Sequence, residues 1–332
     1  MVERVAGEPL YTDLHEKLAI RAWQKLPLAN GMPNHIEILK GKPAKDGRKL
    51  KRIVCRLAGI DPGGSAVIGK RCRPAQAIVE DTIYQNILPN LPFPSLNYYG
   101  MVKETNSEYI WIFVQDAGEE SYSAQLEEHR LLKSEWLALM HTSAMHLGAP
   151  KDLPDKGPKQ YLKRLQSARN AIQSYLTDHH GLQDSDLLPL QSIIDQCDLL
   201  ESRGYEVEAL CEGLPWTLVH GDFKAKNLRL RQDNDQMVLL TFDWGEAGWG
   251  TPATDIMQVD TNFYCLTVRD NWPWLNGKLI ENSAKAGKVF RCLDAIYWEL
   301  SGLKYEGSRA LSCLRIYESR LADALQEAKL EY

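Results

Sequence analysis

Residues 216–245 constrain the fold of this chain more than any other segment. The segment contains three short apolar runs, at residues 216–219, 228–230 and 237–242. Short apolar runs bounded by turn residues predict strands, so the segment predicts a strand, a polar loop and then a β-hairpin with a polar turn at residues 232–235. Polar side chains stand where these strands end. Asp222 and Asn227 lie in the loop, and Asp243 follows the last run, sixteen residues past Asn227.

This spacing is typical of phosphoryl-transfer sites, where an Asp precedes an Asn by five residues and a second, strand-borne Asp precedes a glycine. In-line transfer asks the protein mainly for positioning and charge neutralisation. Asp222 can act as the general base that accepts the proton of the attacking hydroxyl. Asn227 and Asp243 offer the hard oxygen ligands that suit Mg²⁺. We therefore predict transfer of a phosphoryl group from a nucleotide to a hydroxyl.

Each of these residues also has an ordinary structural explanation. An Asp before a helix is commonly an N-cap, and a His-Gly-Asp triplet can be a simple loop. The combination at this spacing, with strands on both sides, favours the functional interpretation.

The bulk composition is that of a globular protein. The chain has 332 residues, of which 44% are hydrophobic and 25% charged, and this length favours two domains with a sizeable core. The formal net charge is -5, whereas a nucleic-acid partner needs a concentrated basic face, so none is expected.

Cysteine usage and the N-terminus suggest a cytoplasmic protein. The seven cysteines are scattered without a Cys-x-x-Cys pair, which fits reduced thiols. The first residues carry no apolar run of signal-peptide length, and eighteen apolar residues never stand together. We expect no membrane span. The sequence leaves the oligomeric state open.

The first third of the chain predicts a small, β-rich lobe. A helical period over residues 10–25 precedes three strand-like runs separated by glycine and proline turns, and a helical run at residues 74–88 precedes two further strands. The predicted strands are residues 35–39, 53–57, 66–70, 98–103 and 109–115. Residues 116–118 form the best candidate for a hinge.

The remainder predicts a larger and mostly helical lobe. The predicted helices, interrupted by the hairpin, are residues 131–146, 158–176, 187–200, 284–303 and 308–330. The prediction is thus an α+β, two-lobed fold. It has an N-terminal lobe at residues 1–115, a hinge at residues 116–120 and a helical C-terminal lobe at residues 121–332.

His220-Gly221-Asp222 with Asn227, followed by the Asp243-Trp244-Gly245 run, resembles the aminoglycoside phosphotransferase and choline kinase group, which has a protein-kinase-like fold. Residues 250–255 also match the Gly-x-Pro-x-x-Asp pattern of that group. The resemblance covers roughly residues 35–260 in order of elements, and it is specific in the catalytic part. It implies that Asp255 and His220 support the catalytic loop, and that ATP or GTP and Mg²⁺ are the cofactors.

The resemblance also implies that the first lobe supplies a lysine for the α- and β-phosphates and a helical glutamate that holds it. Lys70 and Glu80 are the predicted pair, with Arg71 and Asp81 as competing candidates. Backbone groups of Gln115 and Ala117 would face the adenine, although an ordinary linker explains that stretch as well. The lysine-rich residues 41–48 are the nearest candidate for a phosphate-covering loop.

A histidine in the helix at residues 131–146 commonly has a structural role in this group. His146 matches that position better than His141 does. Histidines on such a helical run are more often core or capped residues than ligands.

Two spans favour a small hydroxylated acceptor over a protein. Asp255 lies only twelve residues past Asp243, which leaves little room for a peptide-binding activation segment. Seventy-three residues separate His146 from His220, enough for inserted helices that wall a small-molecule site in the resembled group.

The identity of the acceptor stays open among aminoglycosides, macrolides, amino alcohols and sugar-like metabolites. Four acidic residues after the metal motif could meet an amine, but solvated helix-face charges explain them better and they are not counted as site residues: Asp260, Glu281, Glu299 and Glu306. A catalytically silent nucleotide-binding scaffold, or pseudokinase, is the alternative to an enzyme. A metal-dependent hydrolase fits less well, because only one carboxylate and one amide are aligned for a metal.

Overall fold

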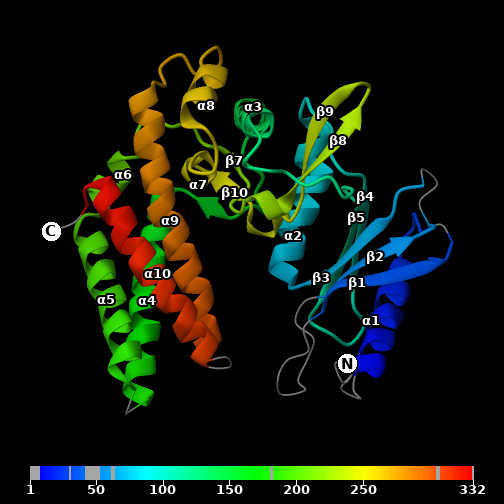
Figure 1. The fold of residues 1–332 in the computed structure, drawn as a ribbon, viewed down its shortest axis with the longest axis horizontal. Coiled ribbons are helices and arrows are strands. Elements are labelled where there is room, and N and C mark those ends of the chain that lie inside the picture. Colours follow the sequence, from blue (N-terminus) through cyan, green and yellow to red (C-terminus); the bar gives the residue numbers. More distant parts are fainter. Residues whose placement is uncertain are drawn as a thin grey trace. The chain divides into compact units, whose positions relative to one another are not determined.

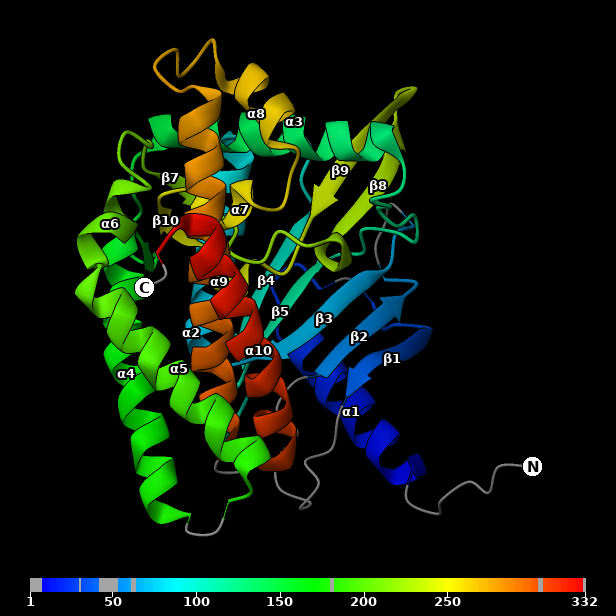
Figure 2. The same cartoon turned by 60° about the vertical axis from the view of Figure 1, so that its left-hand side comes forward.

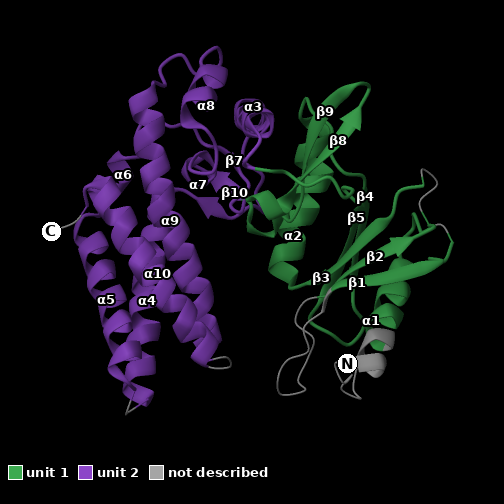
Figure 3. Cartoon of the chain, in the orientation of Figure 1, with its two compact units in different colours: residues 1–123, 224–247 green, residues 124–223, 248–332 purple. Residues whose placement is uncertain are grey.

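The structure is a computed structural model that describes residues 8–29, 31–41, 53–60, 64–179, 182–303 and 307–330 (Figure 1). Its contacts divide the chain into two compact units (Figure 3). Unit 1 comprises Met1–Ser123 and Lys224–Ala247, and unit 2 comprises Ala124–Phe223 and Gly248–Tyr332. The chain therefore passes from unit 2 into unit 1 between Phe223 and Lys224. The boundaries predicted from the sequence, at residues 115–121, remain a prediction.

Unit 1 is built on a five-stranded antiparallel sheet with strand order β1-β2-β3-β5-β4. Its strands are β1 (His35–Gly41), β2 (Ile53–Ala58), β3 (Val67–Cys72), β4 (Tyr98–Lys103) and β5 (Ile110–Gln115). All five predicted strands are confirmed, with ends that shift by at most two residues.

One face of this sheet packs on helix α1 (Glu8–Trp23). Trp23 meets Phe113 edge-on with ring centroids 5.5 Å apart. Gly69 of β3 belongs to this face, because a Cβ added there would lie 2.9 Å from the Phe113 ring and 3.1 Å from the Cys55 sulfur. Successive side chains of a strand point to opposite faces, so Lys70 points away from this core.

The other face carries helix α2 (Pro74–Thr82), which begins with Pro74 in its first turn. The predicted helix at residues 74–88 is continuous in direction but changes type. It passes into a π-helical turn, η1 (Ile83–Ile87), and a 3-10 turn, η2 (Leu88–Asn90). Within the π turn, Tyr84 is buried and stacks on Tyr98 of β4 at 5.2 Å.

The predicted hairpin lies in the last part of the chain that belongs to unit 1. Strands β8 (Leu228–Asp233) and β9 (Gln236–Thr241) pair in register, and the turn is narrower than predicted. Asn234 and Asp235 both have positive φ, as a two-residue type I′ turn requires. The short turns η4 (Ala225–Asn227) and η5 (Trp244–Glu246) flank the hairpin; Asn227 ends η4 and Asp243 immediately precedes η5.

Unit 2 contains a small sheet in which β10 (Gly248–Gly250) pairs parallel with β6 (Asp155–Lys156) and antiparallel with β7 (Thr217–Val219). Gly250 allows the closest of these approaches, since an added Cβ would lie 2.3 Å from the backbone carbon of Lys156. This sheet fixes the chain on both sides of the predicted catalytic loop.

Helices surround that sheet (Figure 2). They are α3 (Glu127–Ala144), η3 (Met145–Leu147), α4 (Pro158–Asp178), α5 (Asp184–Ser202), α6 (Gly204–Ala209), α7 (Ala253–Ile256), α8 (Thr261–Val268), α9 (Gly277–Leu303) and α10 (Gly307–Ala328). The α+β class is confirmed, with a β-sheet N-terminal region and a mostly helical C-terminal region. In the part of the chain that the structure describes, no helix has the length and apolar character needed to cross a bilayer.

Helix α9 is central to unit 2 because it packs against α4, α7, α8 and α10. Its contact with α7 depends on Gly287, where an added Cβ would lie 2.0 Å from the carbonyl oxygen of Ala253. The backbones of the two helices therefore nearly touch. This contact fixes the residues one turn further along α9 against the loop at residues 220–222.

Candidate active site

Unit 1 gathers three of the predicted site residues into one ionic cluster. Lys70 extends from β3 and donates to Glu80 Oε1 of α2 and to Asp243 Oδ1 after β9. The side chains of Lys70, Glu80 and Asp243 are 10%, 3% and 23% exposed. Burial strengthens these contacts, because a charge held away from water needs a partner.

The competing pair is engaged elsewhere. Arg71 donates to Glu104 at 2.5 Å and lies over the Tyr109 ring. Asp81 accepts from the Tyr98 hydroxyl at 2.5 Å. The alternation of β3 explains the difference, since Lys70 and Arg71 face opposite sides of the sheet and only the Lys70 side carries α2.

The backbone at Asp243 is held in the left-handed region, with φ of 66° and ψ of 54°. This region costs an L-residue other than glycine free energy, and such strain occurs preferentially at functional positions. Gly245 follows in η5, where an added Cβ would lie 3.1 Å from Glu80 Oε1 and 3.2 Å from Gln76 Cβ. The glycine allows α2 to pass close to Asp243.

Asn227 ends η4 and is 3% exposed. Its carbonyl oxygen accepts from the Phe242 amide at 3.2 Å, so the hairpin holds the backbone of Asn227 beside the residue that precedes Asp243. An amide oxygen and a carboxylate suit Mg²⁺. Among the described residues, no three His, Cys, Asp or Glu side chains form a metal site, so an ion held here would need phosphate oxygens and water as further ligands.

Backbone hydrogen bonds within unit 1 fix residues 115 and 116 of the predicted adenine-facing segment. The Gln115 amide donates to the Asn97 carbonyl at 2.8 Å, and the Asp116 amide donates to the Ala66 carbonyl at 2.8 Å. Ala117 is buried. The adenine role of Gln115 and Ala117 stays a prediction, and residues 42–48 of the predicted phosphate-covering loop lie outside the described residues.

In unit 2, Asp255 supports the loop that carries Asp222. Asp255 is fully buried in α7 and accepts from the His220 amide at 2.6 Å and the Gly221 amide at 3.0 Å. Gly221 has φ of 75°, a left-handed turn that glycine adopts without strain. The carboxylate thus fixes the backbone immediately before Asp222, which is 9% exposed.

His141 completes this network, a role for which the sequence favoured His146. His141 is buried in α3, with Nδ1 2.8 Å from the Tyr264 hydroxyl and Nε2 3.6 Å from Asp255 Oδ2. His146 lies in η3 and is exposed. The phase of α3 decides between the two histidines, because five residues correspond to about 140° around a helix.

Burial alone would raise the pKa of the Asp255 carboxyl, but interactions with His141 and His220 outweigh it and hold that pKa below its ordinary value. Burial lowers the pKa of His141 despite the opposing effect of Asp255. At neutral pH, Asp255 is therefore a buried anion that accepts backbone hydrogen bonds beside a neutral imidazole.

A contact that the sequence did not suggest reaches Asp222 from α9. Arg291 donates through Nη2 to Asp222 Oδ1 at 2.9 Å and through Nη1 to the Gly221 carbonyl at 2.9 Å. Arg291 lies sixty-nine positions after Asp222. Gly287, one helical turn earlier, was the only local sign of a close helix contact at this position.

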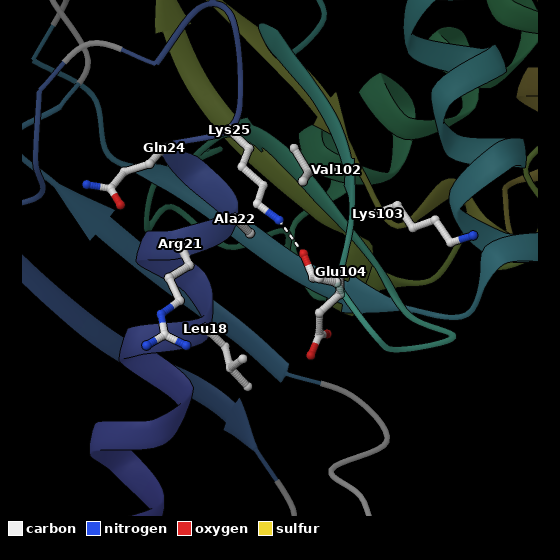
Figure 4. Close-up of a pocket in the computed structure, with 9 residues that line it drawn as sticks. Leu18, Arg21, Ala22, Gln24, Lys25, Val102, Lys103 and Glu104 are labelled. Atoms are coloured by element: carbon white, nitrogen blue, oxygen red, sulfur yellow. Dashed lines mark hydrogen bonds between the residues drawn. The ribbon is translucent and has the colours of Figure 1, made fainter.

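Unit 1 also contains a surface pocket of about 460 Å³ between α1 and β4 (Figure 4). Leu18 and Val102 form its apolar part, and Lys25 donates across it to Thr105 at 2.6 Å. None of the predicted site residues lines it, because it belongs to the α1 side of the sheet and Lys70 points to the other side.

Comparison with protein families matches residues 68–279 to the phosphotransferase enzyme family (APH). The match covers more than half of the chain and includes Lys70, Asp222, Asn227, Asp243 and Asp255. The fold and this match define a phosphotransferase. The chain belongs to the phosphotransferase enzyme family, which confirms the predicted family and enzyme class.

Solved structures share the fold. The GDP and kanamycin complex of APH(2")-IIIa is 12% identical with a TM-score of 0.58, and the alignment covers 95% of this chain and 99% of that chain. A putative aminoglycoside phosphotransferase from Ralstonia eutropha JMP134 is 14% identical with a TM-score of 0.58, covering 96% and 98%. Choline kinase from Cryptosporidium parvum Iowa II is 12% identical with a TM-score of 0.55, covering 96% and 95%. The predicted protein-kinase-like fold is confirmed. No curated protein matches the chain.

Proposed function

We propose that this protein transfers the γ-phosphoryl group of ATP or GTP to a hydroxyl of a small molecule, with Mg²⁺ as cofactor. The observation that carries the proposal is the buried Lys70–Glu80–Asp243 cluster of unit 1. A lysine held between a helical glutamate and a metal-binding aspartate is the arrangement that a nucleotide triphosphate needs in this class of reaction.

The residues of unit 1 hold the nucleotide. Lys70 contacts the α- and β-phosphates, and Glu80 keeps its ammonium group in place. Asn227 and Asp243 would hold Mg²⁺, which would neutralise phosphate charge. Gln115 and Ala117 present backbone groups to the base.

Asp222 of unit 2 serves as the general base. The acceptor oxygen forms a bond to the γ-phosphorus, the bond from that phosphorus to the β-phosphate oxygen breaks, and the nucleoside diphosphate leaves. The hydroxyl proton passes to the Asp222 carboxylate. Asp255 keeps the loop at residues 220–222 in the required conformation through its two backbone hydrogen bonds.

Two features support a small acceptor. Asp255 lies twelve positions after Asp243, and the part of this span that belongs to unit 2 holds only β10 and the start of α7. Helices α4, α5 and α6 occupy the chain between η3 and β7. Two structural neighbours were solved in complex with small molecules, one with kanamycin and the other with hygromycin B.

A screen of nucleoside diphosphate release tests the proposal. Purified protein is incubated with ATP or GTP, with Mg²⁺ or EDTA, and with a panel of aminoglycosides, amino alcohols, sugars and hydroxy acids. We expect Mg²⁺-dependent release that requires an acceptor and is lost in Asp243→Ala, which also weakens nucleotide binding. Nucleotide binding without turnover on any acceptor would instead identify a pseudokinase.

A further inference from the structure

Arg291 places a cation directly on the predicted catalytic base. Its side chain is 20% exposed and that of Asp222 is 11% exposed, so the pair is partly shielded from water. In such a setting the attraction between opposite charges is stronger than at the surface. The Arg291 cation therefore offsets much of the negative charge of the Asp222 carboxylate, so an approaching amine is attracted less than it would be by an unpaired carboxylate.

The guanidinium has further hydrogen-bonding capacity. It carries five N–H donors, of which one contacts Asp222 and one contacts the Gly221 carbonyl. Within the described ranges, no other carboxylate pairs with Arg291. Asp294, one helical turn further along α9, is buried and pairs with Arg164 and Lys156. The remaining donors of Arg291 are thus available to a ligand.

Two acidic residues that could have received an amine are already engaged. Asp260 caps α8 by accepting from the Phe263 amide at 2.9 Å. Glu281 pairs with Lys285 at 2.8 Å on the surface of α9. Glu306 lies outside the described residues. Glu299, the fourth such residue, is half-buried on α9, eight residues past Arg291. The charge that contacts Asp222 directly is the Arg291 cation, which favours an anion at this position.

We infer that the acceptor carries an oxyanion, a carboxylate or a phosphate, close to the hydroxyl that is phosphorylated, and that Arg291 binds it. This inference rests on the proposed function and deepens it by naming the acceptor class. A guanidinium suits the two oxygens of a carboxylate or phosphate, and it repels a cationic acceptor. Arg291 thereby determines which acceptors bind.

Matched acceptors test the inference. Glycerate, glycerol and methyl glycerate share hydroxyl groups but differ in charge, and gluconate and glucose form a second pair. Choline and kanamycin represent cationic acceptors, and glycerol 3-phosphate represents the phosphate case. We expect wild-type kcat/KM to be at least about 10-fold higher for the anionic member of a pair, the size of one charged hydrogen bond.

Variants of Arg291 test whether this residue causes the preference for anionic acceptors. In Arg291→Met the KM for the anionic acceptor should rise about 10- to 100-fold while the KM for the nucleotide stays unchanged, and the preference for anions should disappear. Arg291→Lys should restore part of the preference because it keeps the charge. Lys288→Met, which removes a cation on the same helix that pairs with Glu327, is the matched control and should behave as wild type.

The outcomes separate the two proposals. Turnover that prefers neutral or cationic acceptors overturns the inference and leaves the proposed function intact. An equal loss of kcat on all acceptors in Arg291→Met, or a raised KM for the nucleotide, also overturns it. No turnover on any acceptor removes the proposed function and the inference with it. If Arg291→Met does not fold, wild type and Arg291→Lys decide the question.

Discussion

Replacing Asp255 should release the loop that carries the predicted base. In Asp255→Ala, the amides of His220 and Gly221 lose a buried carboxylate acceptor to which they donate at 2.6 and 3.0 Å. A hydrogen bond to a charged group contributes about 1.5–3 kcal/mol, and Asp255 accepts two of them. Removing the buried carboxylate also removes the cost of keeping its charge away from water, which offsets part of the loss. We expect a net loss of about 3–5 kcal/mol for Ala. For Asn, which keeps one acceptor oxygen, we expect about half as much.

Amide hydrogen exchange of residues 217–223 measures the loss of stability in the loop itself. A local measurement is needed because a chain of two compact units does not unfold as a single two-state system. Exchange should accelerate about 100-fold or more in Asp255→Ala and less in Asp255→Asn. Asp260→Ala, which removes a single cap elsewhere in unit 2, is the control and should leave this segment unchanged. Unaltered exchange in Asp255→Ala, or equal acceleration in both variants, would refute the reasoning.

The lowered pKa of Asp255 also predicts that the stability of this loop depends on pH. The pKa of Asp255 is held below its ordinary value of 3.8, so its stabilisation is present above that pH and is lost as pH falls through the lower pKa of the folded state. Protection of residues 217–223, corrected for intrinsic exchange, should decline in this acidic range in wild type. Asp255→Asn should lack this decline.

Three further predictions follow from single residues. Lys70→Met should raise the nucleotide Kd about 10- to 100-fold in a fluorescent-nucleotide titration, because the phosphates lose the cation that Glu80 holds; an unchanged Kd would remove Lys70 from the site. Gly221→Ala forces a Cβ onto a backbone of positive φ and should cost about 1–2 kcal/mol locally, so that turnover falls and amide exchange of residues 217–223 accelerates about 5- to 30-fold. Gly148→Ala, at a positive-φ glycine outside this loop, should leave that exchange and turnover unchanged. Burial lowers the pKa of Lys133 to about 8. The unfolded chain therefore binds more protons between about pH 8 and 10.5, and wild type should gain up to about 3 kcal/mol of stability over that range relative to Lys133→Met; parallel pH profiles would contradict this.

The local sequence pattern was sufficient to predict the strands of the larger sheet and the fold class. Apolar runs and turn residues predicted the five strands of the larger sheet in unit 1, because alternation and turn chemistry are encoded locally. The hairpin that precedes Asp243 followed from the same signals. The sequence favoured Lys70 and kept Arg71 as a competitor, since it does not say which face of β3 carries α2.

The residues that the sequence missed depend on contacts between distant segments. Arg291 reaches Asp222 across 69 residues through the packing of α9 on α7, and no local pattern encodes that approach. His141 could have been found from the period of its helix. The buried positions Leu137, His141 and Ala144 recur at helical spacing, and His146 falls outside that stripe.

Paired measurements on Asp222→Asn test the central claim most directly. The substitution keeps the shape of the side chain but removes the carboxylate that accepts the hydroxyl proton. Acceptor phosphorylation and nucleotide affinity are measured on the same preparation, with wild type alongside. We predict that transfer falls at least about 100-fold while nucleotide Kd stays within a factor of about two of wild type. Transfer at the wild-type rate in Asp222→Asn would contradict the assignment of Asp222 as the base.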